Sequence, residues 1–317
     1  MAGNKAVQCI GPSYHLTDVK AAAQTAINCF PRKLDGDNWI MESAEGTVDI
    51  ATLSGEARGS RYVSSRWFVV VGTGFYEMQT VGTSVLLGTL NTYNGLVRIS
   101  NNETQVAIVD GIWLYIFNLS TNIFTVVSSA GWRGSDNVDE MDGYFIFAEP
   151  NTAQWYISAI DDGISFDALD FTSADAAPDL IVGHVVSHHQ LWVGGEKSTE
   201  IWVDSGAADF PFTRYNAYPI DIGWVGKNAF CKAADTIFFV GKTERGTGIV
   251  YQVQGNQPLP VSNTAVEESL LTSTDLSGTR MFTWQPKGHE FVCVTAPGVE
   301  TTWVYDCATQ AWHERAT

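Results

Sequence analysis

A short aromatic frame near the end of the chain constrains the fold more than any other feature. Residues 300–312, ETTWVYDCATQAW, alternate apolar and polar side chains, which is the period of a strand with one buried face. Within this frame Asp306 and Thr309 stand between Tyr305 and Trp312, which are seven residues apart. Asp and Thr favour turns because their side chains form hydrogen bonds with backbone amides a few residues further on. The frame therefore predicts two strands joined by a turn that side chains stabilise.

The frame recurs, so the chain is a repeat protein. Residues 117–124, FNLSTNIF, place aromatic, Asn, Thr and aromatic residues at the same offsets, and a looser copy runs from Val203 to Phe210. From Thr47 onward each unit has an apolar strand, a short turn containing Gly or Asp, and a second strand. The first strands are expected at residues 67–71, 105–109, 144–147, 190–193, 236–240 and 290–294. The second strands are centred on six repeat positions: Tyr76, Tyr115, Ile157, Ile201, Tyr251 and Trp303.

The spacing of the six repeat positions, 39 to 52 residues, predicts the fold class. A period of this length with several short strands per unit is typical of propeller blades of four antiparallel strands. One blade alone leaves both of its faces uncovered, and its neighbours cover them. We therefore expect an all-β protein, with an N-terminal arm over residues 1–46 and a β-propeller of six four-stranded blades over residues 47–317. A pair of β-sandwiches and a β-helix are the alternatives.

The arm has expected features of its own. Thr17 is placed to cap a short helix over residues 18–27, which would end before Pro31. The last unit ends in WHER at residues 312–315, a segment typical of an outermost strand, so we expect early residues to pair with that last blade. Neither a signal peptide nor a membrane span is expected, because the chain has no basic-then-apolar opening and no run of eighteen apolar residues.

Cysteines and histidines do not form a recognisable reactive set. The five cysteines, at positions 9, 29, 231, 293 and 307, show no CxxC spacing, so we expect reduced and mostly buried thiols. Cys293 and Cys307 flank one predicted hairpin. His188 and His189 would face opposite sides of a strand, and His184 and His188 would share a face about 13 Å apart, so no metal site is predicted.

No motif points to catalysis. Residues 159–166, AIDDGISF, resemble the Asp-box turn of sialidase-type propellers, although Ala159 stands where that box has Ser or Thr. In that pattern the Asp closes a hairpin away from the catalytic residues, so we interpret the segment as a structural turn. We predict no catalytic residues, no cofactor and no metal.

The net charge of −17 is unevenly distributed. Between Ser135 and Phe210 there are fifteen acidic residues and a single basic one, Lys197. For any single residue the usual interpretation is a solvated acidic rim, but the asymmetry as a whole stands out because clustered like charge disfavours the compact state. A surface of this sign is not expected to bind nucleic acid tightly, because tight binding comes from basic contacts to phosphates.

Two family resemblances follow from these motifs. The frame at residues 305–312, with the pair Gly194–Gly195, resembles kelch-type propellers. Residues 11–31, 157–171 and 288–315 are similar, in that order, to the tail-hub or nozzle proteins of short-tailed bacteriophages, which are also called packaged-DNA stabilisation proteins. The chain departs from that family at Arg32–Lys33, where an acidic residue is usual, and it is shorter than is usual in that family.

The phage resemblance implies a structural virion protein made in the bacterial host cytoplasm. Six copies would form a ring that extends and closes the portal–adaptor channel, retains packaged DNA and serves as its exit. The implied partners are further copies, the portal and adaptor proteins, tail fibre or needle proteins, and passing DNA that is not held tightly; no membrane is involved. An acidic lumen would let DNA slide. Nine acidic residues are candidates for the channel or its rim: Asp136, Asp139, Glu140, Asp142, Asp161, Asp162, Asp175, Asp179 and Glu196.

Two other functions are compatible with the sequence. A kelch-like propeller would act as a protein-interaction module through its blade loops and would be a monomer. A propeller glycosidase or lectin would instead respond to carbohydrate.

Overall fold

Strands make up almost all regular structure of the chain. The computed structural model describes residues 25–33, 39–215, 218–244, 246–286 and 288–316. The helix expected over residues 18–27 lies outside the described residues except for its last three, where Ile27 forms a β-bridge. In the described ranges there are one α-helix, α1 (Thr264–Leu271), and one 3₁₀ helix, η1 (Leu276–Gly278).

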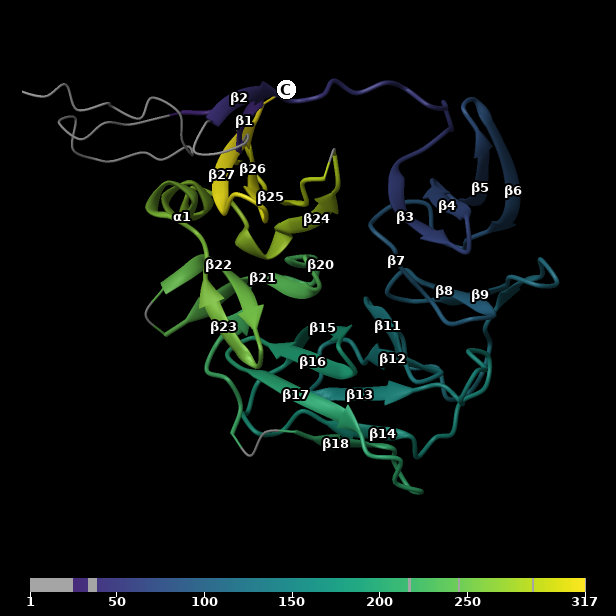
Figure 1. Ribbon diagram of the computed structural model, residues 1–317. Coiled ribbons are helices and arrows are strands. Elements are labelled where there is room, and N and C mark those ends of the chain that lie inside the picture. The colour runs from purple at the N-terminus through teal and green to yellow at the C-terminus, as the bar shows by residue number, and fades with distance from the viewer. Residues whose placement is uncertain (1–24, 34–38, 216–217, 245, 287, 317) are drawn as a thin grey trace, which may run out of the picture. The chain divides into compact units, whose positions relative to one another are not determined.

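Six antiparallel sheets follow one another along the chain, each made of consecutive strands (Figure 1). Blade 1 consists of β3 (Ala57–Val63), β4 (Arg66–Val71), β5 (Gly74–Thr80) and β6 (Thr83–Thr89). Blade 2 consists of β7 (Arg98–Asn101), β8 (Gln105–Val109), β9 (Leu114–Asn118) and β10 (Phe124–Val126). Blade 3 consists of β11 (Val138–Met141), β12 (Tyr144–Ala148), β13 (Gln154–Ile157) and β14 (Phe171–Ser173).

The remaining blades have the same order. Blade 4 consists of β15 (Ile181–Ser187), β16 (Gln190–Gly195), β17 (Thr199–Asp204) and β18 (Phe212–Arg214). Blade 5 consists of β20 (Phe230–Ala233), β21 (Thr236–Thr243), β22 (Gly246–Gln254) and β23 (Gln257–Pro260), and the two-residue β19 (Gly223–Trp224) adds a fifth strand. Blade 6 consists of β24 (Arg280–Trp284), β25 (Phe291–Thr295), β26 (Thr302–Asp306) and β27 (Ala311–Arg315). The prediction of an all-β propeller with six blades is confirmed.

The two strands predicted for each unit are the second and third strands of a blade. The six segments expected as first strands coincide with the second strands, β4, β8, β12, β16, β21 and β25. All six repeat positions lie on third strands; five are buried, and Tyr76 is half-buried. In the middle strand β8 both faces are covered, so it reads QVAIV, is buried throughout and lacks the alternation of a half-exposed strand.

The chain divides into two compact units. Unit 1 is formed by residues 1–47 with 224–317, and unit 2 by residues 48–223. Unit 2 holds blades 1 to 4, and unit 1 holds blades 5 and 6. Each unit buries its apolar side chains in layers between neighbouring blades. Between blades 1 and 2, for example, Phe68, Phe75 and Phe117 pack with ring centroids 5.4–5.5 Å apart.

The aromatic frame sets the register of the hairpins that contain it. Tyr305 pairs directly with Trp312, and Phe117 with Phe124. In the turn of blade 6, Asp306 Oδ1 accepts a hydrogen bond from the amide of Ala308 at 2.9 Å, and Thr309 Oγ1 donates to Asp306 Oδ2 at 2.8 Å. In blade 2, Asn118 Oδ1 accepts from two amides, those of Ser120 and Thr121. The predicted side-chain turn is therefore confirmed.

Helix α1 lies in unit 1 and was not expected from the sequence. Asn263 caps it, because its side chain accepts a hydrogen bond from the amide of Val266. Val266 and Leu270 are buried in the layer between blades 5 and 6.

The four cysteines in the described ranges are free thiols, as expected, but only Cys293 is buried. Cys29, Cys231 and Cys307 are partly exposed, so the expectation of mostly buried thiols is wrong. Cys293 packs with Phe30 on one face of blade 6, whereas Cys307 packs in the layer towards blade 5.

The described part of the arm is attached to the outer edge of blade 6. It forms a hairpin of β1 (Cys29–Lys33) and β2 (Trp39–Ser43). Just before it, Ile27 bridges Glu314 in parallel, the Glu314 amide donates to Ala26 O at 2.9 Å, and the Asn28 amide donates to Glu314 O at 2.8 Å. The predicted pairing of early residues with the last blade is confirmed.

The side chain of Phe30 packs the arm against blade 6. Phe30 is buried and lies 5.1 Å from the rings of His289 and Phe291 and 5.8 Å from His313. His313 is fully buried, and neither of its ring nitrogens has a hydrogen-bond partner among the described residues. Burial, together with the positive charge of Arg315 and the neighbouring His289, lowers the pKa of His313 to about 3.

This buried imidazole predicts an acid sensitivity. The folded pKa of His313 lies below that of the unfolded chain, so the unfolded state takes up the proton first and stability falls as the pH drops from about 6.5 towards 3. The slope attributable to this residue is about 1.4 kcal/mol for each pH unit. His313→Phe is expected to remove that slope in urea unfolding measured between pH 7 and pH 4.

The matched control is His189→Phe, because the His189 side chain is 83% exposed. We expect this variant to keep the wild-type slope. Equal slopes for wild type and His313→Phe would contradict the assignment.

Candidate functional site

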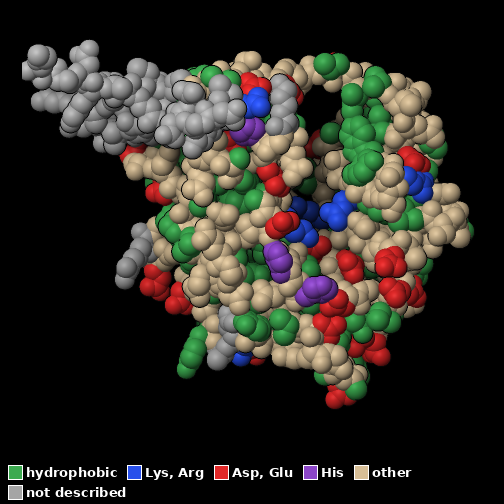
Figure 2. Space-filling model, viewed as in Figure 1, with side chains coloured by type: hydrophobic (Ala, Val, Ile, Leu, Met, Phe, Trp, Pro, Cys, Tyr) green, Lys and Arg blue, Asp and Glu red, His purple; other side chains and the backbone are tan. Residues whose placement is uncertain are grey.

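The acidic residues of blades 3 and 4 form the candidate site, and the fold distributes them between two ends. In a four-stranded meander the first and third turns lie at one end, here called the hairpin end. The second turn and the connection to the next blade lie at the opposite end, here called the linker end. Figure 2 shows acidic side chains outnumbering basic ones over blades 3 and 4.

At the hairpin end, three of the nine candidates lie close together. Asp142 and Gly143 form the turn between β11 and β12, both with positive φ, which is typical of a two-residue hairpin turn. Asp161 lies beside it, since its amide donates to Gly143 O at 2.9 Å. Asp162 follows in the same β13–β14 connection and accepts a hydrogen bond from the Ile164 amide at 3.0 Å.

Glu140 joins this group from β11. Its Oε1 accepts a hydrogen bond from the Gly143 amide at 2.8 Å, so its side chain lies over the turn. Burial raises the pKa of Glu140, and the negative charges of Asp139, Asp142 and Asp161 raise it further. The hairpin end of blade 3 therefore concentrates negative charge where the backbone turns.

Four other candidates lie at the linker end. Asp136 and Asp175 belong to the connections that lead into blades 3 and 4, and Glu196 lies in the β16–β17 turn. Asp179 fastens the same turn, because its Oδ2 accepts from the amides of Lys197 at 2.7 Å and Ser198 at 2.9 Å. A Cβ atom at Gly195 would lie 2.5 Å from Asp179 Oδ2, so a larger residue there would displace this carboxylate.

The ninth candidate, Asp139, is buried within the sheet. Its Oδ1 accepts from the Ser100 hydroxyl at 3.3 Å, and its Oδ2 accepts from the Val186 amide at 2.8 Å. Asp139 thus links the innermost strands of blades 2, 3 and 4. The structure places four candidates at the hairpin end and four at the linker end of these blades, and it holds Asp139 inside.

The histidines are arranged differently from the expectation. His188 and His189 are not strand residues; they form the turn between β15 and β16, with φ of 52° and 53°. Histidine is among the non-glycine residues that tolerate positive φ. His189 Nδ1 lies 3.2 Å from Asp142 Oδ1, at the hairpin end, whereas His184 is buried with its Nε2 3.0 Å from Ile146 O.

Residues 159–166 form a turn. Ala159 and Asp162 make an isolated antiparallel bridge, and the Ala159 amide donates to Ser165 O at 2.8 Å. The side chain of Asp162 closes the turn through its bond to the next-but-one amide. These contacts therefore give the Asp-box-like segment the structure of a turn.

A cavity of about 540 Å³ opens on the face of blade 1 in unit 2. Its wall is mainly apolar and includes Ile50, Leu53, Trp67, Val69, Val71 and Met78. Arg58 is the ionisable residue of the lining, and its guanidinium donates to the carbonyl oxygens of Gly72, Thr92 and Gly95. The described lining offers no nucleophile–base pair.

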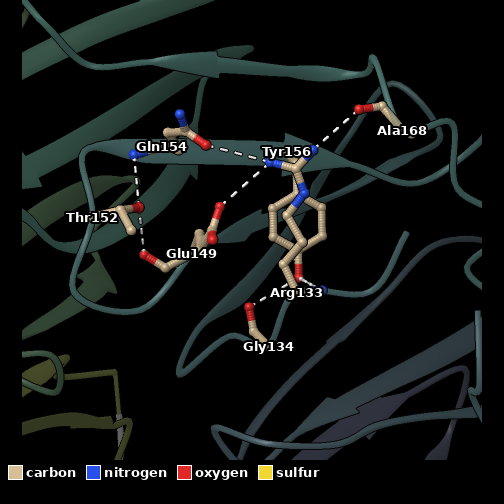
Figure 3. Close-up of polar contacts among 7 residues, drawn as sticks. All are labelled: Arg133, Gly134, Glu149, Thr152, Gln154, Tyr156 and Ala168. Atoms are coloured by element: carbon tan, nitrogen blue, oxygen red, sulfur yellow. Dashed lines mark hydrogen bonds and ion pairs between the residues drawn. The ribbon is translucent and has the colours of Figure 1, made fainter. Parts of the chain in front are cut away.

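Arg133 fastens the connection between blades 2 and 3 to blade 3 (Figure 3). Its guanidinium donates to Gln154 Oε1 at 3.3 Å and to Ala168 O at 3.1 Å, and it pairs with Glu149 at 3.4 Å. It also lies 4.4 Å from the ring centroid of Phe171, within cation–π range. Arg133 is therefore committed to the fold.

A buried tyrosine repeats this fastening in two blades. Tyr156 in β13 and Tyr115 in β9 occupy equivalent registers, opposite Phe147 and Ile108. The Tyr156 hydroxyl donates to Gly134 O at 2.9 Å, and the Tyr115 hydroxyl donates to an Asp110 carboxylate oxygen at 2.9 Å. Each hydroxyl also accepts a hydrogen bond from a backbone amide in the connection that leads into its blade. Burial raises the pKa of both tyrosines, so both stay neutral donors.

Tyr156→Phe is expected to destabilise the protein by about 1–2 kcal/mol, because it leaves Gly134 O and the Arg133 amide without their partner. Urea unfolding measures the loss. Tyr93→Phe, at a side chain that is 70% exposed, should leave the midpoint unchanged. A similar loss in both variants would show that the buried hydroxyl contributes nothing specific.

The described residues contain no group of three or more His, Cys, Asp or Glu side chains placed to hold a metal ion. None of the described helices has the length and apolar character needed to cross a membrane.

Comparison with known proteins gives one family and a set of distant folds. Residues 23–316 match the profile of a family described as "Bacteriophage P22 Gp10, beta-propeller". No curated protein matches the chain. A chain in the crystal structure of the mitotic checkpoint complex is similar at 10% identity and a TM-score of 0.52, covering 95% of this chain and 88% of that one. The computationally designed Ika8 protein is similar at 13% identity and a TM-score of 0.47, covering 81% and 73%. At such identities the likeness concerns the fold alone.

Proposed function

Because this chain belongs to the family of phage P22 Gp10 β-propellers, we propose that it is a structural subunit of a phage tail nozzle or hub. In this proposal six copies form a ring beneath the portal and adaptor. The ring extends and closes their channel, retains the packaged DNA and acts as its exit conduit. The subunit has a structural role in the virion and no catalytic one. The family match over residues 23–316 is the observation that carries the proposal.

The arrangement of charge supports the conduit. A channel for a polyanion should offer few phosphate contacts, since each one strengthens retention. Blades 3 and 4 carry acidic side chains at both ends, with Asp142 and Asp161 at one and Asp175 and Glu196 at the other. All four of these side chains are exposed. The acidic lumen of the proposal therefore has two candidate faces on each subunit.

The oligomeric state tests the proposal. Native mass is measured for the purified chain alone and mixed with the portal and adaptor proteins of the same phage. A species of six copies, six times 34.6 kDa, is expected in at least one sample. A strict monomer in both samples would contradict the nozzle and favour the kelch-like interaction module.

Neutralising one end at a time identifies the face that meets DNA. One double variant carries Asp142→Asn and Asp161→Asn at the hairpin end, where Asn tolerates the positive φ of both residues. The other carries Asp175→Asn and Glu196→Gln at the linker end. Each removes two charges, so the two variants serve as controls for each other.

We expect one variant, and not the other, to slow DNA release from assembled virions, followed by the fluorescence of a DNA-binding dye. The slower variant marks the end that lines the channel, because less repulsion leaves the DNA held longer. Wild-type release from both variants would count against an acidic lumen.

A further inference from the structure

The six outermost strands differ in how their free edges are protected. An open strand edge is a template for pairing with another chain, so folded proteins shorten it, charge it, interrupt it with proline or cover it. In this protein β10, β14 and β18 are only three residues long. Strand β23 contains Pro258 and Pro260, and β27 is covered by the parallel pairing of residues 26–28.

Strand β6 shares none of the protections of these five strands, although its pairing with β5 has two register shifts, between Phe75 and Tyr76 and between Met78 and Thr80. It is seven residues long, TSVLLGT, and carries no charged residue and no proline. It is the last strand of its sheet, and no backbone hydrogen bond among the described residues reaches its outer edge. Val85 is 40% exposed and Leu86 is 55% exposed, so apolar side chains accompany the open edge. An open edge of this kind is a template for pairing with another strand.

The chain itself contains a segment suited to this edge. Residues 6–10, AVQCI, are uncharged and apolar except for Gln8, and they are bounded by Asn4–Lys5 and by Gly11–Pro12, which is the pattern of a short strand between turn signals. They belong to the 24 N-terminal residues that lie outside the described ranges. The described chain starts at Thr25, and residues 26–28 pair with the outer edge of blade 6.

We propose that residues 6–10 of one copy add to the open edge of β6 in a second copy. The fourteen residues from 11 to 24 join the segment to Thr25 and span at most about 50 Å when extended. Backbone hydrogen bonds to β6 supply the affinity, as in strand addition, and Val85 and Leu86 supply the apolar contact. The inference rests on the proposed ring, in which each copy would receive one arm and donate another.

Cross-linking tests which chain occupies the edge. Leu86→Cys places a thiol on β6, and the arm carries its own thiol at Cys9. A short bis-maleimide is used because it tolerates several registers. We expect a covalent species of twice the chain mass on a denaturing gel, with a peptide joining residues 9 and 86 by mass spectrometry.

Controls separate the rival occupants. With Leu86→Cys in a Cys9→Ser background the doubled species should vanish; a doubled species joined through residue 86 of both chains would mean that two β6 edges pair, which contradicts the proposal. A 9–86 link within a chain of single mass would show that the arm folds back onto its own subunit, which also contradicts it. No 9–86 link of either kind would refute the docking.

A charge on the edge provides a second test. Leu86→Lys is expected to lower the fraction of ring at least tenfold in native mass measurements at a fixed concentration. Val81→Lys adds the same charge at the β5–β6 turn, where Val81 is 77% exposed, and should leave the ring intact. Circular dichroism verifies that both variants fold.

Different results would overturn the six-copy ring and the addition of residues 6–10 to β6. A wild-type chain that remains monomeric with its portal and adaptor would overturn the ring and, with it, this inference. A wild-type ring that Leu86→Lys leaves intact, with no 9–86 link, would overturn the inference alone.

Discussion

A four-stranded blade that is apolar on both faces must be covered on both, and the rest of this structure follows from that requirement. In unit 2 the layers between blades 1 to 4 satisfy it with stacked aromatic rings such as those of Phe75 and Phe117. In unit 1, blade 5 covers one face of blade 6, and Phe30 of the arm packs on the other. The arm is thus part of the core of blade 6, which explains why a histidine beneath it, His313, is held neutral.

Many of the polar side chains serve this same packing. Arg133, Tyr115 and Tyr156 fasten the connections between blades, and Asp139 and Asp179 fasten backbone amides. The number of acidic residues in the sequence therefore includes carboxylates that stabilise the fold as well as exposed carboxylates such as that of Asp175, which is 77% exposed. Only the exposed carboxylates are available to repel DNA, and they define what a channel surface on this subunit would consist of.

The sequence predicts the structure where the pattern of residues is local and repeated. Tyr305 and Trp312 are opposed in the hairpin because seven residues separate them around an Asp turn. The prediction failed for His188 and His189, since neither residue is a usual turn former, although both adopt positive φ. The end of the blade at which each acidic residue lies follows from the order of the strands. Asp142 and Asp136 are close in sequence, yet they lie at opposite ends of blade 3. Helix α1 had a readable cap in Asn263, but eight residues are too few for a clear helical period.

In the proposed function this subunit holds the genome inside the virion, and the retention of DNA by phage particles measures that role. Phage particles assembled without the chain are treated with nuclease, and the protected DNA is quantified before and after purified protein is added. Particles without the chain are expected to lose their DNA, and particles given the protein promptly after packaging are expected to retain it. Full protection of the genome in particles that lack the chain would contradict this role.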